Sequence, residues 1–457
     1  MNSDETSTMS TMGAGRAPYL IQIGFDYGTA FSKCVYRDMV ADRAWVHLDP
    51  ARASEQDPYL IPSVVIHQGG VFSRHRDAGA GYPTNGLVHL KHALELVALD
   101  EWDSPPLRDY AGQSPAMDQA GLEKLVIAAN VFFLANAYQE VLQGVRLRFP
   151  DFGSKSGDEA RISMAIPVAD AEHEDIAGLF RRVMIAAWSL AKQMFYSGVG
   201  IPSRIKPLIA CVDTGIEDDG CFLYPEVSAN VQAFTRSRTS RHGTYLFTDV
   251  GAGTVDQSLF VYHQNEGHEV LTYLAAWNPP LGSGQIEYRA AAAQGVRSRE
   301  HLERLRLLKE EGVLNGELRS VILELQDELG CGTERLLLAA KNRLYVLKQL
   351  TDACLIFGGG GYRQDVYDEP VRGAFRQKQI FGRVVNCGKV GIPRPSDIEF
   401  TSRQSHWMDR LSVAYGLSFF PEDLDRYRFP SEMPRVLPRM REVMHDGVLR
   451  SPTKDEC

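Results

Sequence analysis

The chain lacks any apolar run of about 18 residues, the length that a helix needs to cross a bilayer. The longest candidate, residues 125–138, is interrupted by Asn130 and Asn136 and is typical of a buried helix. The first dozen residues have no basic region followed by an apolar segment, so they do not form a secretory signal. We therefore expect a cytoplasmic protein in which residues 1–18 form a disordered tail.

Cysteine is scarce, and neither sign of charge dominates. Seven cysteines occur in 457 residues without a Cys-x-x-Cys pair, which disfavours a disulfide framework and a zinc site. The formal net charge of −9 disfavours binding to nucleic acid or to an anionic membrane through charge alone, so we expect neither as a partner. Hydrophobic residues make up 44% of the chain, as in ordinary globular proteins, and its length predicts more than one domain.

One local pattern occurs twice, at residues 19–36 and again at residues 244–262. In each copy a β-rich run ends in an aspartate, Asp26 or Asp249. A glycine-containing turn and a threonine follow, and then a second β-rich run. A repeat on the scale of half the chain favours two related lobes that face each other.

Both turns have the composition of phosphate-binding loops. Glycine lets backbone N–H groups approach phosphate oxygens without a Cβ atom in the way, and the threonine hydroxyl adds a donor. Two such turns from opposite lobes would hold a triphosphate, with Asp26 and Asp249 near a shared Mg²⁺, which needs few carboxylates beside phosphate and water. Four successive glycines at residues 358–361 follow a third β-rich run and favour close approach to a planar ligand.

The rest of the sequence reads as mixed α/β. Helical periodicity predicts helices over residues 122–147 and 174–194, and two or more helices over residues 299–350. Residues 160–166 are β-rich and predict a strand. The proline-bearing residues 103–115 predict a polar loop.

The motifs resemble those of the nucleotide-binding domain of DnaK-type (seventy-kilodalton heat-shock) chaperones in the actin-like ATPase superfamily. Residues 23–32 resemble the phosphate-1 motif, residues 247–256 the phosphate-2 motif and residues 355–361 the adenosine motif. Shorter matches follow in family order at residues 61–63, 89–91, 165–168, 225–229, 281–284 and 410–416. The resemblance implies an α/β, two-lobed actin-like ATPase fold, in which each lobe is a duplicated ribonuclease-H-like core with insertions.

The resemblance also divides the chain. It implies lobe I at residues 19–242, with an insertion at about 60–145, and lobe II at residues 243–400. A closing helix at residues 401–420 would return to lobe I, and residues 421–457 would be a C-terminal tail.

The tail is shorter than the ~100 residues of a β-sandwich, so we expect no peptide-binding domain in this chain. A separate protein partner is expected instead. Residues 103–116 and 362–400 exceed what the fold needs and are the expected docking regions; the alternative is that both are passive loops.

Individual roles follow from the resemblance. Asp26 and Asp249 would organise a hydrated Mg²⁺, and Lys91 would contact the γ-phosphate and stabilise the charge that develops in transfer. Glu226 and Asp256 would help to place the metal shell and the attacking water. The residues expected to hold ATP or ADP are Gly28, Thr29, Ala30, Gly251, Ala252, Gly253, Thr254, Gly282, Gly358, Gly359 and Gly360.

Some positions depart from the family pattern. Ala30 replaces a second hydroxyl and Ala252 replaces a glycine, but neither adds much bulk. The adenine-clamping helix is poorly matched. Its candidates are Glu303, Arg306 and Lys309, and the alternative is a solvated helix face.

The two nearby histidines, His89 and His92, share a helical face but lack a third metal ligand in the sequence. We therefore expect them to have no role as a metal site.

Several functions are compatible with these residues. The leading hypothesis is a slow ATPase that acts as a nucleotide-dependent conformational switch for a partner protein. The alternatives are a filament-forming actin-like protein, a small-molecule kinase of the same superfamily, and an ATP sensor that does not hydrolyse its ligand.

Overall fold

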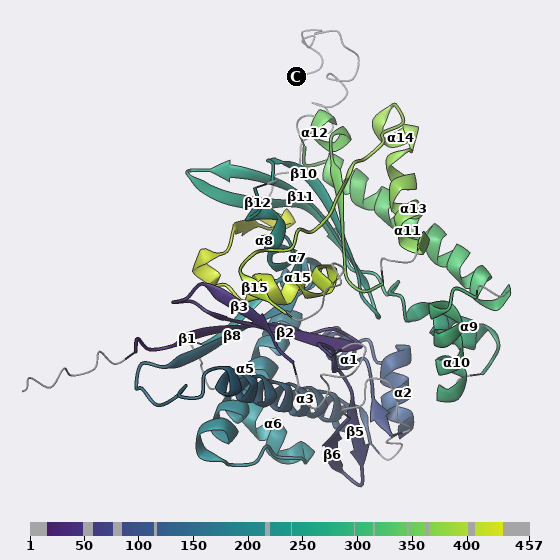
Figure 1. Cartoon of the computed structure of the whole chain (residues 1–457). Coiled ribbons are helices and arrows are strands. Elements are labelled where there is room, and N and C mark those ends of the chain that lie inside the picture. Colours follow the sequence, from purple (N-terminus) through teal and green to yellow (C-terminus); the bar gives the residue numbers. More distant parts are fainter. Residues whose placement is uncertain are drawn as a thin grey trace, which may run out of the picture.

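The chain folds as a mixed α/β protein with three β-sheets (Figure 1). This description rests on a computed structural model. The residues that the structure describes are 16–48, 58–75, 85–113, 117–214, 220–238, 240–296, 298–313, 316–344, 347–361, 365–400 and 407–432.

The first sheet is built around the first aspartate-glycine hairpin. β1 (Leu20–Asp26) pairs with β2 (Phe31–Asp38) antiparallel and with β8 (Glu159–Ile166) parallel. β1 is buried along nearly its whole length, because helices cover both of its faces. The other strands of this sheet are β3 (Arg43–Val46), β4 (Ile61–Pro62), β9 (Cys221–Pro225) and β15 (Ile398–Glu399).

The second sheet is built in the same way around the second hairpin. β10 (Gly243–Val250) pairs with β11 (Val255–Asn265) antiparallel and with β13 (Cys354–Gly358) parallel. The other strands of this sheet are β12 (His268–Trp277), β14 (Lys389–Val390) and β16 (Arg426–Arg428).

The two large sheets share one strand order. The first runs β15-β3-β2-β1-β8-β9 and the second runs β16-β12-β11-β10-β13-β14, with the same senses at corresponding positions. The repeat that the sequence predicted from two hairpins therefore extends to six strands.

The first sheet carries most of the helices that the N-terminal half contributes. α3 (Gln119–Arg148) and α5 (Glu174–Ser197) pack against each other below it, as predicted over residues 122–147 and 174–194. α3 is long and apolar enough to cross a membrane, but 78% of its most apolar window is buried inside the protein, as in a core helix. The remaining helices here are α1 (Leu90–Ala98), α2 (Pro105–Gln113), α4 (Val168–Ala171) and α6 (Ile205–Asp213).

A small third sheet lies in the region predicted as an insertion. Its order is β6-β5-β7, with bounds Val71–Arg74, Val65–Gln68 and Gly86–Leu87. α3 lies against this sheet, so the insertion shares the core of the first half instead of forming a separate unit.

The prediction of a loop at residues 103–115 was wrong, because α2 occupies Pro105–Gln113. Pro105 and Pro106 stand in the first turn of the helix, where a missing N–H breaks no intrahelical hydrogen bond. Leu107 and Tyr110, three residues apart on one face, are fully buried and anchor the helix.

The prediction of two or more helices over residues 299–350 is confirmed by the structure. The second sheet is covered by its own helices. They are α9 (Gln285–Ala293), α10 (Arg299–Glu310), α11 (Gly316–Lys341), α12 (Leu347–Thr351), α13 (Asp365–Phe375) and α14 (Lys378–Phe381). Their apolar faces form a hydrophobic cluster separate from that of the first sheet.

Short elements join the two large sheets. α7 (Glu226–Asn230) and α8 (Gln232–Thr235) pack against α15 (Trp407–Leu417), and all three lie between the sheets in Figure 1. A separate apolar cluster places Val227 and Phe234 of these helices against Phe247, Phe260 and Tyr273 of the second sheet.

The C-terminal boundaries differ from those predicted. β15 pairs with β3 of the first sheet, so the chain has returned there by Ile398, before the predicted boundary at residue 401. Residues 401–406 lie outside the described residues. α15 packs on β1 and β2, where Gly24 lets the helix backbone approach the strand.

The structure describes the segment after α15 as far as residue 432, and the remainder of the predicted tail lies outside the described residues. β16 pairs with β12 of the second sheet. The Tyr224 hydroxyl donates to the Asp425 carbonyl over 2.8 Å, and the Ser431 N–H donates to Glu172 over 3.0 Å, so this segment also contacts the first half. β16 has no alternating apolar pattern and forms because the edge of β12 supplies its backbone partners.

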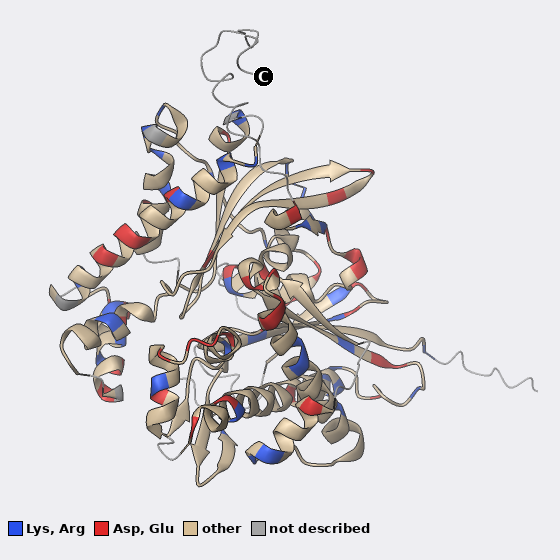
Figure 2. Ribbon diagram, turned by 180° about the vertical axis from the view of Figure 1, so that it is seen from behind, with Lys and Arg blue, Asp and Glu red and all other residues tan. Residues whose placement is uncertain are grey.

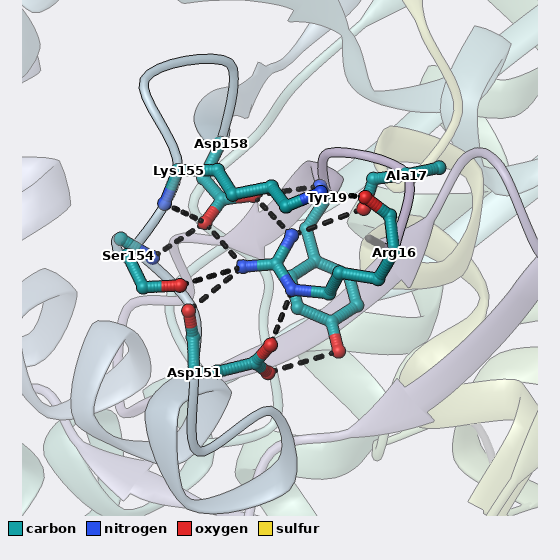
Figure 3. Close-up of polar contacts among 8 residues, drawn as sticks. Arg16, Ala17, Tyr19, Asp151, Ser154, Lys155 and Asp158 are labelled. Carbon is teal, nitrogen blue, oxygen red and sulfur yellow. Dashed lines mark hydrogen bonds and ion pairs between the residues drawn. The ribbon is translucent and has the colours of Figure 1, made fainter. Parts of the chain in front are cut away.

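At the other end, the predicted disorder of residues 1–18 was wrong for Arg16, and residues 1–15 lie outside the described residues. The Arg16 guanidinium lies inside the loop at residues 151–158 (Figure 3). It donates to Asp158 Oδ1 over 2.7 Å and to the Asp151 carbonyl over 2.8 Å. The first described residue is therefore fixed by this ion pair.

Basic and acidic residues are interspersed along the helices of both halves in the described part of the chain (Figure 2). This mixed distribution accompanies the modest net charge of −9.

We predict that Gly416→Ala destabilises the protein. A Cβ atom at this position of α15 would lie 1.9 Å from the Ala229 carbonyl oxygen of α7, so the two helices must separate. Overpacking of this kind costs about 1–3 kcal/mol. The matched control is Gly373→Ala in α13, where a Cβ atom meets nothing within 4 Å and helix propensity should raise stability slightly. Urea unfolding of both variants would measure the difference, and equal stabilities would contradict the packing of α15 on α7.

Candidate functional site

The first turn, residues 27–30, connects β1 to β2 and follows Asp26. Asp26 is buried and faces Lys33 across the hairpin, and the Lys33 ammonium lies 2.5 Å from Asp26 Oδ2. The Ala30 carbonyl accepts the Ser63 N–H over 2.9 Å, so the short match at residues 61–63 lies beside this turn.

Sequence reasoning missed Lys33. The β1–β2 register places residue 33 opposite residue 26 with six residues between them, whereas a four-residue turn would have placed residue 31 there, so the turn length alone did not indicate Lys33.

The second turn, residues 251–254, connects β10 to β11 and is held by a neighbouring loop. The N–H groups of Gly282, Ser283 and Gly284 donate to the carbonyls of residues 253, 251 and 252 over 3.1, 2.9 and 2.8 Å. A Cβ atom at Gly282 would lie 2.5 Å from the Gly253 carbonyl carbon. Gly282 therefore supports the second turn from behind.

The two turns meet. A Cβ atom at Gly253 would lie 2.9 Å from Thr29 Cγ2 and 3.1 Å from its hydroxyl oxygen. Gly28, Thr29 and Ala30 of one sheet are thus brought beside Gly251, Ala252, Gly253 and Thr254 of the other, although more than 200 residues separate them in the sequence.

Two more carboxylates come from the second hairpin. Asp249 and Asp256 are directly opposite each other in the β10–β11 register, and both are buried. Asn230, at the end of α7, donates from Nδ2 to Asp249 Oδ2 over 2.8 Å. Burial, then the negative charges of Glu226 and Asp26, raise the pKa of Asp249 to about 8. Burial, then Glu226 and Asp170, raise the pKa of Asp256 well above its usual value.

Asn230 is a second residue that sequence reasoning missed. It lies four positions after Glu226, so both side chains leave the same face of the short helix α7. That spacing could be read from the sequence, but the contact with Asp249 depends on where the second sheet lies.

Lys91 enters the same region from α1. Its ammonium lies 3.1 Å from Glu226 Oε2, and both side chains are largely buried. Burial lowers the pKa of Lys91, but the charges of Glu226, Asp26 and Asp170 outweigh burial and raise it overall. Lys91 is therefore a permanently charged cation among the carboxylates.

A buried amide holds Lys91 and the first turn together. The Tyr27 hydroxyl donates to Asn130 Oδ1 over 2.5 Å, and Asn130 Nδ2 donates to the Leu90 carbonyl over 3.1 Å. Asn130 interrupts the apolar pattern of α3 because it links two parts of the site.

The third turn, residues 358–361, lies against the second. Gly359 has φ of 77°, and a Cβ atom there would lie 2.3 Å from Asp249 Oδ1. The Gly361 N–H donates to the Val250 carbonyl over 3.0 Å, and Gly360 lies beside Arg410 of α15. These glycines thus allow the third turn to lie close to the protein's own Asp249 and Val250, as well as to any ligand.

The candidate adenine contacts are already engaged in protein contacts. Arg306 pairs with Glu303 over 2.5 Å and with Glu310 over 2.7 Å on a partly exposed face of α10. Lys309 is buried against Glu287 over 2.5 Å and donates to the Ser283 carbonyl over 2.7 Å. This arrangement favours the alternative of a solvated face for Glu303 and Arg306 and a structural role for Lys309.

His89 begins α1 and links the two halves. Its Nε2 lies 2.9 Å from the Tyr288 hydroxyl of α9, and its backbone is left-handed with φ of 56°. Burial and the neighbouring His92 lower the pKa of His89 to about 4.

The donor set suits Mg²⁺. Both carboxylate oxygens of Asp256 and Oδ1 of Asn230 are buried without a hydrogen-bond partner in the described part of the chain. Among the described residues, no group of three or more acidic, histidine or cysteine side chains converges closely enough to hold an ion directly. An ion here would be bound largely through water and phosphate, as Mg²⁺ commonly is.

A pocket of about 390 Å³ lies elsewhere, between β12, α11 and Pro430, and its lining includes none of the predicted site residues. The residues of the site are brought together instead by the meeting of the turns and by the buried ion pairs.

Comparison of the sequence with protein-family models gives no match, and comparison with curated proteins gives no significant match.

We predict that His89 makes folding sensitive to acid. Its pKa is about 4 in the folded chain and about 6.5 when unfolded, so the unfolded state binds the proton first. The contribution to stability is complete above pH 6.5 and is lost as the pH falls, by about 2 kcal/mol at pH 5. His89→Asn, which tolerates the left-handed backbone, should remove this part of the pH dependence.

Urea unfolding at pH 7 and pH 5 is the measurement, with His268→Asn at an exposed position as the control. The same acid sensitivity in wild type and His89→Asn would contradict the buried environment of His89.

Proposed function

We propose that the chain binds Mg-ATP between two lobes of an actin-like fold and hydrolyses it slowly. The observation that carries this proposal is the meeting of the two aspartate-glycine-threonine turns, with Thr29 packed against Gly253. Each turn directly follows a buried aspartate, so the Thr29 hydroxyl and carboxylates from both halves lie in one region. Such a region fits a polyphosphate with a divalent cation.

The topology of the two large sheets also supports this proposal. Each large sheet has an antiparallel three-stranded meander followed by parallel strands, and each bears its functional aspartate at the end of the first meander strand. A duplicated ribonuclease-H-like core has this arrangement. Lobe I of the proposal corresponds to the first sheet with its helices, and lobe II to the second sheet with its own.

Electrostatics supports a cation at the site. Its carboxylates outnumber its lysines, and burial makes the excess negative charge costly. The raised pKa of Asp249, caused first by burial and then by Glu226 and Asp26, reflects this cost. The groups concerned are Asp26, Glu226, Asp249 and Asp256 on the acidic side and Lys33 and Lys91 on the basic side.

The residues of the chain divide the work of hydrolysis. Asp26 and Asp249 would hold the water shell of Mg²⁺, which supplies charge neutralisation at the phosphates. The Lys91 ammonium would stabilise the charge that develops on the transferred phosphoryl group. Asp256, directly opposite Asp249 in the hairpin, would help with Glu226 to orient the attacking water.

The expected biological output is a conformational switch that a separate protein reads. Nucleotide that contacts both lobes favours the closed arrangement through its differential affinity. The apolar cluster of α7 and α8 with the second sheet would serve as the hinge region. Small-angle scattering with and without saturating Mg-ATP should show compaction, and identical profiles would count against a switch.

We predict that Asp249→Asn folds normally and loses turnover. The raised pKa of Asp249 means that burial already favours a neutral group, so the amide should be tolerated. Loss of one charge-organising group from a preorganised site commonly lowers the rate by about 10²–10³-fold. Lys91→Met should have a similar effect on phosphate release. Asp327→Asn, at an exposed position of α11, is the control and should turn over like wild type.

Phosphate release measured beside calorimetric Mg-ATP affinity separates the possible outcomes. Binding without release in wild type would favour the non-hydrolysing sensor, whereas no binding at millimolar ATP would reject the proposal. Wild-type release by Asp249→Asn would remove the assignment of Asp249. ATP-dependent light scattering would instead favour the filament alternative, and phosphate transfer to a small acceptor would favour the kinase.

A further inference from the structure

Asp170 is a buried acid that connects the two halves of the protein beside the site. It lies in α4, the single helical turn that follows β8 and Pro167, and is 8% exposed. Its Oδ2 accepts a hydrogen bond from Asn278 Nδ2 over 3.2 Å. Asn278 belongs to the second half, just after β12 ends at Trp277. The contact therefore crosses the junction between the two large sheets.

Asn278 begins the loop that supports the second turn. The next residue, Pro279, accepts the Val255 N–H over 3.0 Å through its carbonyl. Residues 282–284 then donate three backbone hydrogen bonds to the second turn. A displacement of Asn278 is thus transmitted along five residues to the backbone of the turn at residues 251–254.

The orientation of the Asn278 amide depends on this contact. Asn278 Oδ1 is buried and has no hydrogen-bond partner among the described residues, so the bond from Nδ2 to Asp170 orients the group. Two successive prolines, Pro279 and Pro280, directly follow Asn278 and restrict the backbone further.

Charged residues approach Asp170 from several elements. Glu95 and Lys91 come from α1, Glu226 from α7 and Asp256 from β11. Burial, then Glu95, raise the pKa of Asp170 to about 7, while Lys91 and the Asn278 amide lower it. Lys91 and Asn278 are therefore the two neighbours that favour the carboxylate form.

We propose that Asp170 is a positioning residue that sets the second turn relative to Lys91 and Glu226, by holding Asn278 across the junction. The effect on the backbone of the turn is independent of any ligand. Its consequence for catalysis rests on the proposed function. This role requires no contact between Asp170 and nucleotide.

The test is an exchange of the two side chains. Asn278→Asp places two carboxylates face to face and removes the donor, so the bond is lost at pH 8. The double variant Asp170→Asn with Asn278→Asp restores one donor and one acceptor with the total charge unchanged. Asp170→Ala removes the acceptor alone. Glu174→Gln, at an exposed position of α5, is the matched control.

The first measurement is hydrogen exchange of peptides covering residues 251–257 and 278–285 in the ligand-free protein. Asn278→Asp and Asp170→Ala should exchange these amides at least about tenfold faster than wild type, and the double variant should return to within about threefold. Lowering the pH from 8 to 6 should slow exchange, after correction for the intrinsic rate, in Asn278→Asp only, because a protonated carboxyl can again donate.

The second measurement is phosphate release with ATP. The single variants should lower kcat by about tenfold, and the double variant should recover it. Unchanged exchange in both single variants, or a folded double variant that exchanges as fast as Asn278→Asp, would overturn the positioning role. If wild type shows no ATP binding, the proposed function fails, but the exchange experiment still decides the inference. If a single variant does not fold, hydrogen exchange of the double variant compared with wild type decides the inference.

Discussion

Concentration of negative charge in a buried region is the constraint on which the rest of the structure depends. Four buried or largely buried carboxylates lie in the region where the two large sheets meet, and among the described residues Lys33 and Lys91 form ion pairs with two of them. An uncompensated charge away from water is costly, so each acid must find a cation, a proton or a donor. Asp26 pairs with Lys33 and Glu226 with Lys91, whereas Asp249 and Asp256 have raised pKa values. The Mg²⁺ that we propose would offset part of this negative charge.

Both large sheets meet this constraint with the same local structure. A hairpin in each sheet presents an aspartate at the end of its first strand and a glycine-containing turn after it. The turns can touch because Gly253 has no side chain, and Asp249 can lie under the third turn because Gly359 has none. Loop 278–284, with Gly282 at its closest point, then holds the second turn from behind.

The junction between the halves consists of a few unlike contacts. An apolar cluster around Val227 and Phe247 buries hydrophobic surface at the junction, but such contacts do not by themselves fix the orientation of the two halves. Directional contacts include those of Asn230 with Asp249, His89 with Tyr288 and Asp170 with Asn278, and those of the segment that carries β16. Because a small number of polar contacts define the relative position of the sheets, their loss or protonation should alter that position more readily than it alters either sheet.

The sequence by itself determined the two hairpins, the strand runs and the long helices, because those elements follow from local periodicity and turn chemistry. It also indicated Asp26, Asp249 and Lys91, and the structure brings these residues into one region. Only the tertiary structure decided the contacts of Asn230, Asn278 and Asp170, the order of β15 and β16, and the engagement of Arg306 with its own helix. The reason is physical. A periodic pattern indicates which face of an element is buried, whereas a contact between distant segments depends on how the two sheets pack relative to each other in the folded protein.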